Sequence, residues 1–168
     1  MGEYVIGIDP GASGAIGLVY TRLKTCLSVH DMPVDEQGFV QIRTNMLGEH
    51  GFPEAIFVEK CASMPKQGVA STFKFGLNNG MCRLWAATFS MRWELITPQA
   101  WKKYHGLIKK TKKDSLLLAR RKWPNAPLDR QKDSDRAEAL LIAEYGLHIL
   151  RGSHAGSSQG AQNQYQKE

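Results

Sequence analysis

The chain has 168 residues, of which 42% are hydrophobic and 23% are charged, as expected for one globular domain of ordinary size. No stretch approaches the roughly 18 apolar residues needed to cross a bilayer, and the N-terminus lacks a secretory signal pattern, so we expect a cytoplasmic protein without a membrane partner. The net charge of +6 favours an anionic partner instead.

The first half of the sequence predicts three strands, a helix and a fourth strand. Apolar runs at residues 3–9, 15–20 and 25–32 are separated by short turns, which predicts an antiparallel meander. Apolar residues recur at helical spacing over 37–49. A further apolar run over 55–58, ended by Glu59, predicts a further strand at 55–59.

The second half predicts a long helix, a short strand and three further helices. The long helix is expected over 68–89 and the strand over 93–96. Thr97 followed by a proline is a typical helix start. Two more helices are expected, over 114–123 and from residue 134 or 135 to about 150.

These elements predict one α/β domain over residues 1–151, with a mixed sheet that has helices on its faces. No internal repeat is evident. Residues 152–168 consist mainly of Ser, Gly, Gln, Asn and Lys, with almost nothing apolar. Such a segment cannot offset its ordering entropy, so we expect a disordered polar tail there.

Four acidic residues stand at the ends of predicted elements. Asp9 ends the first strand and is followed by a Pro-Gly turn, and Glu59 ends the fourth strand. Asp135 and Glu138 open the last helix three residues apart, so their side chains share one helix face. Carboxylates in these positions, within a lysine-rich chain, are what metal-dependent phosphodiester hydrolysis requires.

The chemistry of that reaction fixes how many acids are needed. The attacking and leaving oxygens lie on opposite sides of phosphorus, and two divalent ions roughly 3.5–4 Å apart stabilise both. Mg²⁺ prefers hard oxygen ligands and keeps waters, so three or four carboxylates suffice for a pair of ions. We therefore predict two Mg²⁺ ions in one site, with Mn²⁺ able to substitute, and Asp9 as the ligand that bridges them.

Each acid also has a structural interpretation. An Asp before Pro-Gly is often only a turn former, and Glu59 could be a surface acid. Asp135 could cap the last helix, and Glu138 could complement the helix dipole. Asp133 is an alternative to Asp135, but it lies five residues from Glu138 and would share its face less well.

Cysteine and histidine offer little metal chemistry by comparison. Cys26, Cys61 and Cys82 are widely spaced and form no CxxC pair, so neither a disulfide framework nor a zinc site is supported. Buried thiols are expected instead.

A basic segment lies just before the helix predicted at 114–123. Within twelve residues that contain no acid, and among Tyr104 and His105, stand six lysines: Lys102, Lys103, Lys109, Lys110, Lys112 and Lys113. Lysines that neutralise phosphates give nucleic-acid affinity that depends on salt. A solvated basic loop is the structural alternative, but the acids elsewhere in the domain favour DNA or RNA.

Three of these segments resemble the RuvC-type Holliday junction resolvases of the RNase H-like superfamily. The run Gly7-Ile8-Asp9-Pro10-Gly11 resembles the opening of that family, and Val58-Glu59 is similar to its second acidic strand. The run from Asp135 to Ala143 resembles its C-terminal helix, where two acids three apart precede an Ala-Leu-rich stretch. The three segments agree in order and spacing, which fits a bacterial or bacteriophage member of the family.

The resemblance implies an RNase H-like fold, a five-stranded mixed sheet flanked by helices. It also implies a homodimer that nicks two symmetric strands of a four-way DNA junction, with helix 68–89 near the dimer interface. The implied metal and catalytic set is Asp9, Glu59, Asp135 and Glu138.

The resemblance further implies that the lysines over 102–113 contact the DNA backbone, with Lys113 the best match for a catalytic lysine and Lys112 and Lys110 as close alternatives. The chain differs from the family in two places. Glu138 stands where the family usually has Asp. No aromatic residue follows Glu59 closely, and Met64 is the side chain available to insert apolar surface at the junction.

The function predicted from these features is a metal-dependent endonuclease of DNA recombination and repair. It would resolve Holliday junctions by paired nicks that leave 5′-phosphate and 3′-hydroxyl ends. One alternative is an RNase H-like nuclease for other branched DNA, flaps or RNA–DNA hybrids, because the acids are shared across the superfamily. Another is a non-catalytic junction-binding module, against which the presence of all four acids argues. A kinase-like phosphate loop at 9–14 is disfavoured, because the chain is too short for that two-domain architecture.

Overall fold

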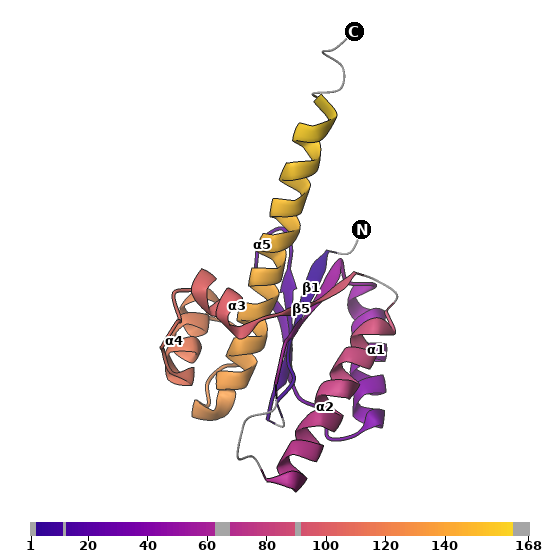
Figure 1. The fold of residues 1–168 in the computed structure, drawn as a ribbon, viewed down its shortest axis with the longest axis vertical. Coiled ribbons are helices and arrows are strands. Elements are labelled where there is room, and N and C mark those ends of the chain that lie inside the picture. Colours follow the sequence, from indigo (N-terminus) through magenta and orange to yellow (C-terminus); the bar gives the residue numbers. More distant parts are fainter. Residues whose placement is uncertain (1–2, 12, 63–67, 90–91, 163–168) are drawn as a thin grey trace.

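The computed structural model describes residues 3–11, 13–62, 68–89 and 92–162, with side chains as far as residue 152. In this part of the chain, five strands form one sheet with the order β3-β2-β1-β4-β5 (Figure 1). β1 pairs antiparallel with β2 and parallel with β4; β2 and β3 are antiparallel, and β4 and β5 parallel. The predicted meander and mixed sheet are confirmed. The strands are β1 (Tyr4–Asp9), β2 (Ala15–Tyr20), β3 (Cys26–Asp31), β4 (Ala55–Glu59) and β5 (Trp93–Ile96).

Helices cover both faces of the sheet (Figure 1). α1 (Glu36–His50) and α2 (Val69–Ala87) lie on one face. The other face carries α3 (Pro98–Tyr104), α4 (Lys112–Lys122) and α5 (Ser134–Gln162), the last preceded by a short 3₁₀ turn at Gln131–Asp133.

Two helix boundaries differ from the prediction. α4 begins at Lys112 rather than residue 114, because the Asp114 carboxylate accepts hydrogen bonds from both the backbone N and the hydroxyl of Thr111, at 2.8 Å each. α5 continues to Gln162, beyond the expected end near residue 150. The state of the polar tail in solution stays a prediction. No helix in the described ranges is long and apolar enough to span a bilayer.

Alternation along β1 sends its side chains to two separate cores. Tyr4, Ile6 and Ile8 pack with α1 and α2, whereas Val5 packs with the residues of α3, α4 and α5. Asp9 is in phase with Val5, so its side chain belongs to the α5 face.

Glycines in the two central strands let α5 lie directly on the sheet. A Cβ on Gly7 would stand 2.1 Å from the Ala139 carbonyl oxygen, and one on Gly17 would stand 2.9 Å from the Leu140 nitrogen. Both distances are too short for any side chain. The backbone of the first turns of α5 is therefore held against β1 and β2, which brings the start of this helix to the end of β1.

Candidate active site

Asp9 ends the central strand of the sheet and is almost fully buried, at 6% exposure. Its carboxylate accepts a hydrogen bond of 3.3 Å from the Gly11 nitrogen, in the turn that follows the strand. Asn78 of α2 fixes the same turn from the other face of the sheet, since its amide nitrogen donates to the carbonyls of Pro10 and Gly11 at 2.9 Å each. The strand and the helix together set the position of Asp9.

Two acids of α5 complete a compact cluster with Asp9. One carboxylate oxygen from each of Asp9, Asp135 and Glu138 lies within 4.8 Å of the other two, and all three residues are buried. Buried Ser115 of α4 donates its hydroxyl to Glu138 Oε1 at 3.0 Å. Asp9 is far from the other two acids in the sequence, and the fold brings all three together as expected.

Glu59 lies beside this cluster but faces a different partner. It ends β4, the parallel neighbour of β1, one residue after the paired Ile8 and Val58. Its Oε1 accepts a hydrogen bond of 2.8 Å from the indole nitrogen of fully buried Trp101. The Glu59 charge nevertheless acts on Asp9, whose pKa it raises. The group within 4.8 Å thus has three members, with Glu59 at its edge.

Crowding of the acids changes their protonation. Burial first, and the Glu59 charge second, raise the pKa of Asp9 to about 7. Burial also raises the pKa of Glu138, against the lowering effect of the Lys112 and Lys102 charges. The cluster therefore holds more negative charge than its surroundings stabilise, which is the property of a cation site.

The lysine that contacts the acids is Lys112, one of the alternatives to Lys113 as the catalytic lysine. The Lys112 ammonium hydrogen-bonds to Asp135 and lies 3.8 Å from Glu138 Oε2. Although burial alone would lower the pKa of Lys112, the Asp135 hydrogen bond and the nearby acids together raise it. Lys113, the next residue of α4, is exposed. Lys112 and Ser115 are three residues apart in α4, so they share the helix face that meets the acids.

Asp133, the alternative to Asp135, has a structural role. It is 1% exposed, and its carboxylate accepts hydrogen bonds from the backbone and the guanidinium of Arg130 at 2.6–2.8 Å. These contacts between buried Asp133 and exposed Arg130 shape the turn before α5. The choice of Asp135 agrees with the geometry.

The other predicted DNA-contacting residues form a more scattered set. Lys102 is close enough to Glu138 to lower its pKa, and its ammonium lies 5.1 Å from the centre of the Trp101 ring. Lys103, Lys109 and Lys110 are exposed. Met64 lies outside the described residues.

Sequence reasoning missed the residues that orient the acids. Ser115, Trp101 and Asn78 are linked to their acids or turn across 23, 42 and at least 67 positions of the chain. No local pattern signals such contacts. Of the three, Trp101 borders the basic segment at 102–113, for which the sequence already favoured DNA binding.

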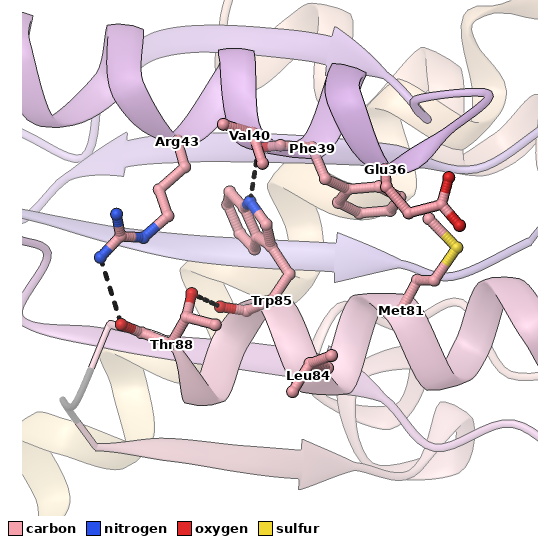
Figure 2. Close-up of a pocket in the computed structure, with 8 residues that line it drawn as sticks. All are labelled: Glu36, Phe39, Val40, Arg43, Met81, Leu84, Trp85 and Thr88. Carbon is pink, nitrogen blue, oxygen red and sulfur yellow. Dashed lines mark hydrogen bonds between the residues drawn. The ribbon is translucent and has the colours of Figure 1, made fainter.

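A separate, apolar hollow of about 410 Å³ lies between α1 and α2 (Figure 2). Phe39 and Trp85 form its floor, and the indole nitrogen of Trp85 donates to the Phe39 carbonyl at 2.8 Å. Val40 and Leu84 stand at its rim, 55% and 68% exposed. This hollow is on the α1–α2 face, whereas the acids lie on the α5 face.

No protein-family model matches the sequence, and no curated protein matches it significantly. Solved structures do match. Thermus thermophilus RuvC matches with a TM-score of 0.63 and 24% identity, over 89% of this chain and 96% of that one. T. thermophilus RuvC in complex with a Holliday junction substrate matches with a TM-score of 0.62 and 22% identity, over the same shares of both chains.

A third solved structure is more distant. The yeast mitochondrial Holliday junction resolvase Ydc2 matches with a TM-score of 0.53 and 16% identity, over 85% of this chain and 77% of Ydc2. The match spans nearly the whole domain in each case. The chain therefore shares the fold of RuvC and Ydc2, the RNase H-like fold predicted from its three acidic segments.

Proposed function

We propose that this protein is a metal-dependent, structure-selective DNA endonuclease that resolves four-way junctions. The observation that carries the proposal is the cluster of Asp9, Asp135 and Glu138, with Glu59 beside it, at the carboxyl ends of the two central parallel strands. The likeness to resolvases, one of them bound to a Holliday junction substrate, supports the choice of substrate. The reaction would take place in the cytoplasm of a bacterial cell or phage-infected host.

The donor set fits hard divalent cations. All members are carboxylates, which suit Mg²⁺ and Mn²⁺. Asp9, Asp135 and Glu138 would hold one ion, and Asp9 with Glu59 a second, so that Asp9 bridges them. When bound, such a pair supplies Lewis-acid stabilisation of the charge that develops on the phosphate oxygens.

The surrounding residues position this set. Trp101 holds Glu59 and Ser115 holds Glu138, so neither carboxylate must be ordered when substrate arrives. Lys112, at the edge of the cluster, is placed to act on a phosphate oxygen. Hydrolysis then breaks the bond between phosphorus and O3′: the attacking water becomes part of a 5′-phosphate, and O3′ takes up a proton to leave a 3′-hydroxyl.

We also propose that the active form is a homodimer that cuts two symmetric strands. A junction with two-fold symmetry requires two active sites related by the same symmetry. Apolar side chains of α2 that would be core in an isolated domain are instead exposed: Phe73 by 71%, Leu77 by 52% and Leu84 by 68%. Together with the hollow between α1 and α2 (Figure 2), they form an apolar surface suited to a second copy.

The proposed reaction is tested by incubating the protein with synthetic four-way junctions, flaps and RNA–DNA hybrids, with and without Mg²⁺. We expect Mg²⁺-dependent paired incisions in the junction, and Asp9→Asn should bind it without cutting. Preferred cleavage of the flap or hybrid would support the wider nuclease function. Comparable cutting by Asp9→Asn would refute the metal cluster.

The dimer is tested separately by the mass of the protein in sedimentation. The wild type should be a dimer and Leu84→Lys a monomer, because the change puts a charge into the apolar surface. The matched change Leu23→Lys, at an equally exposed position outside α2, should leave the dimer intact. A monomeric wild type, or a dimeric Leu84→Lys, would contradict the assigned surface.

A further inference from the structure

A second hollow, of about 440 Å³, opens directly beside the acid cluster. One wall is the turn after β1 with Ser13, another is the end of β3 with Asp31, and the third is the segment 130–135. Asp135 belongs both to this hollow and to the acid cluster, so the two are continuous. Nothing in the proposed reaction uses the hollow so far.

Two cations line the hollow in different ways. Arg130 is oriented in advance, because its Nε and Nη2 both donate to Asp133 Oδ1, at 2.8 and 2.6 Å. Lys132 is exposed and, among the described residues, forms no ion pair. One cation is thus fixed in place, and the other is free to follow a ligand.

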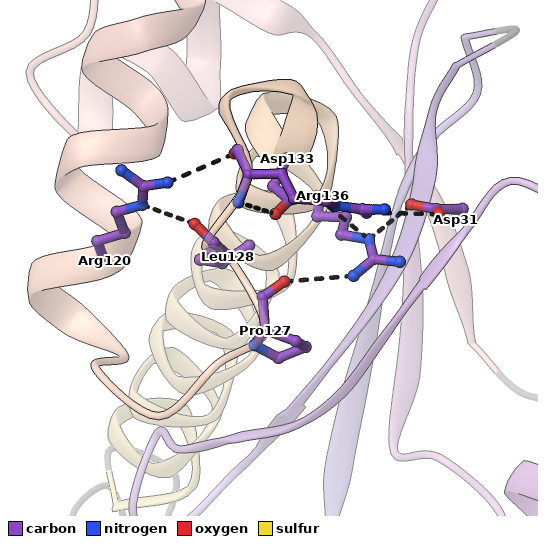
Figure 3. A network of polar contacts seen from close by, with 7 residues as sticks. Asp31, Arg120, Pro127, Leu128, Asp133 and Arg136 are labelled. Atoms are coloured by element: carbon purple, nitrogen blue, oxygen red, sulfur yellow. Dashed lines mark hydrogen bonds and ion pairs between the residues drawn. The ribbon is translucent and has the colours of Figure 1, made fainter.

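The segment that carries both cations is braced on several sides (Figure 3). Arg136 donates to Asp31 at 2.6 Å and to the Pro127 carbonyl at 3.2 Å. Arg120 of α4 donates to the Leu128 carbonyl at 2.6 Å. These contacts hold the wall of the hollow against β3, α4 and α5, so its shape does not depend on a ligand.

The charges of this network leave a surplus. Asp31 and Asp133 are matched by Arg130 and Arg136, and Asp135 is matched by Lys112. Arg120 and Lys132 have no acidic partner among the described residues, and of these two only Lys132 lines the hollow that adjoins the acidic cluster. A phosphate placed at the acids is repelled by them, and a nearby cation offsets part of that repulsion.

We propose that this hollow is a subsite for the backbone phosphate of the nucleotide adjacent to the cut, held by Lys132 and the oriented guanidinium of Arg130. This inference rests on the proposed nuclease function. A strand whose scissile phosphate lies at the acids must continue into an adjoining surface, and the hollow is continuous with them. Its volume is near the lower end of the roughly 300–1,000 Å³ found for small-molecule sites, which suits one nucleotide unit.

Lys132→Gln tests the subsite without endangering the fold, because the side chain is exposed and makes no ion pair with described residues. The matched control is Lys24→Gln, an exposed lysine in the turn between β2 and β3, at the end of the sheet opposite Asp9. Binding to a four-way junction is measured without divalent ions over a series of salt concentrations. We expect Lys132→Gln to weaken binding several-fold and to reduce the slope of log K against log salt by about 0.9. Lys24→Gln should change neither.

Junctions that carry a single neutral methylphosphonate then locate the contact. One such substitution, next to the incision site, should weaken binding by the wild type and weaken binding by Lys132→Gln less, because only the Arg130 contact is left there to lose. The subsite would be overturned if the loss of binding from the methylphosphonate and the loss from Lys132→Gln add up at every position tested. It would also be overturned if Lys132→Gln kept the salt slope of the wild type. The polar network would then serve only to hold the start of α5. If the wild type cuts the junction while Lys132→Gln behaves like Lys24→Gln, the subsite alone fails. A wild type that neither binds nor cuts the junction would overturn both proposals.

Discussion

The two faces of the sheet differ in how their helices meet it. On one face, α5 approaches β1 and β2 so closely that glycines are required at positions 7 and 17. On the other, α1 and α2 stand off through large side chains such as Phe39, Trp85 and Phe89, which fill the space between helix and strand. Close backbone contact fixes positions to within a fraction of an ångström, whereas side-chain packing tolerates adjustment.

The chemistry of the two faces follows the same division. The α5 face carries three buried acids that must be held near one another despite their repulsion. The α1–α2 face has no such cluster among its described residues, and the hollow between its two helices is open and mainly apolar (Figure 2). We infer that the rigid face serves the reaction and the open one serves association.

The largest expected effect is a gain in stability when the charge of Asp9 is removed, because this tests whether the acids on the α5 face repel one another. Asp9 titrates near 3.8 when unfolded and near 7 when folded. Between these pH values the folded state binds the extra proton, so stability falls as pH rises and stays low above pH 7. At about 1.4 kcal/mol per pKa unit, the full shift corresponds to about 4 kcal/mol. Metal-free Asp9→Asn should therefore unfold at higher urea concentration than the wild type at pH 8, and at a similar one below pH 4.

Divalent ions and a second variant complete this test. Mg²⁺ or Mn²⁺ should raise the melting temperature of the wild type and affect Asp9→Asn far less, because cation binding to the folded state stabilises it. Asp133→Asn, which removes a buried carboxylate whose oxygens accept hydrogen bonds from Arg130, should destabilise at the same pH. An Asp9→Asn protein no more stable than the wild type at pH 8 would show that Lys112 already neutralises the cluster.

The next effect tests the contrast in helix approach directly. Gly7→Ala forces a Cβ into the backbone of α5 and should cost about 3 kcal/mol or more in the free energy of unfolding. Gly48→Ala is the matched change on the other face, in exposed α1, where nothing lies within 4 Å of the new Cβ. It should stabilise by roughly 0.5–1 kcal/mol, because alanine favours the helix. Equal effects of the two substitutions in urea unfolding would refute the contrast between the faces.

Much of this arrangement could be predicted from the sequence, because hydrophobic periodicity and turn-forming residues are local signals. Apolar runs bounded by turns identified the strands, and the Pro-Gly turn after Asp9 marked the end of β1. The three-residue spacing of Asp135 and Glu138 placed both on one helix face. The fold class followed from the order of these elements.

What could not be predicted depends on contacts between distant residues. Which lysine contacts the acids stayed open among Lys113, Lys112 and Lys110, because the answer depends on the face that α4 turns toward α5. The orientation of Glu59 toward Trp101 requires knowing that β4 and α3 meet. The sequence also could not decide whether the apolar stripe on α2 is buried or exposed. A helix face that packs in the core and one that forms an interface have the same periodicity.

Asn78 connects α2, on one face of the sheet, to the turn beside the acids of the other face. Its substitution should have the smallest effect of those predicted. The Asn78 amide donates to two carbonyls of the turn that follows Asp9. Asn78→Ala should cost about 1–2 kcal/mol in stability, since each hydrogen bond contributes roughly 0.5–1.5 kcal/mol. Because the turn then loosens, Mn²⁺ affinity measured by titration calorimetry should also fall several-fold. Asn78→Asp, which sets a carboxylate against the same two carbonyls, should lose more of both.

The neighbouring Asn79 provides the control for this prediction. Its side-chain oxygen is buried without a hydrogen-bond partner among the described residues, so Asn79→Ala removes an unsatisfied polar group and should leave Mn²⁺ affinity unchanged. If Asn78→Ala lowers stability but not Mn²⁺ affinity, α2 only supports the fold. If both fall, the helix that we assign to the dimer interface also holds the turn of Asp9, and association of two copies would bear on the same turn through Asn78.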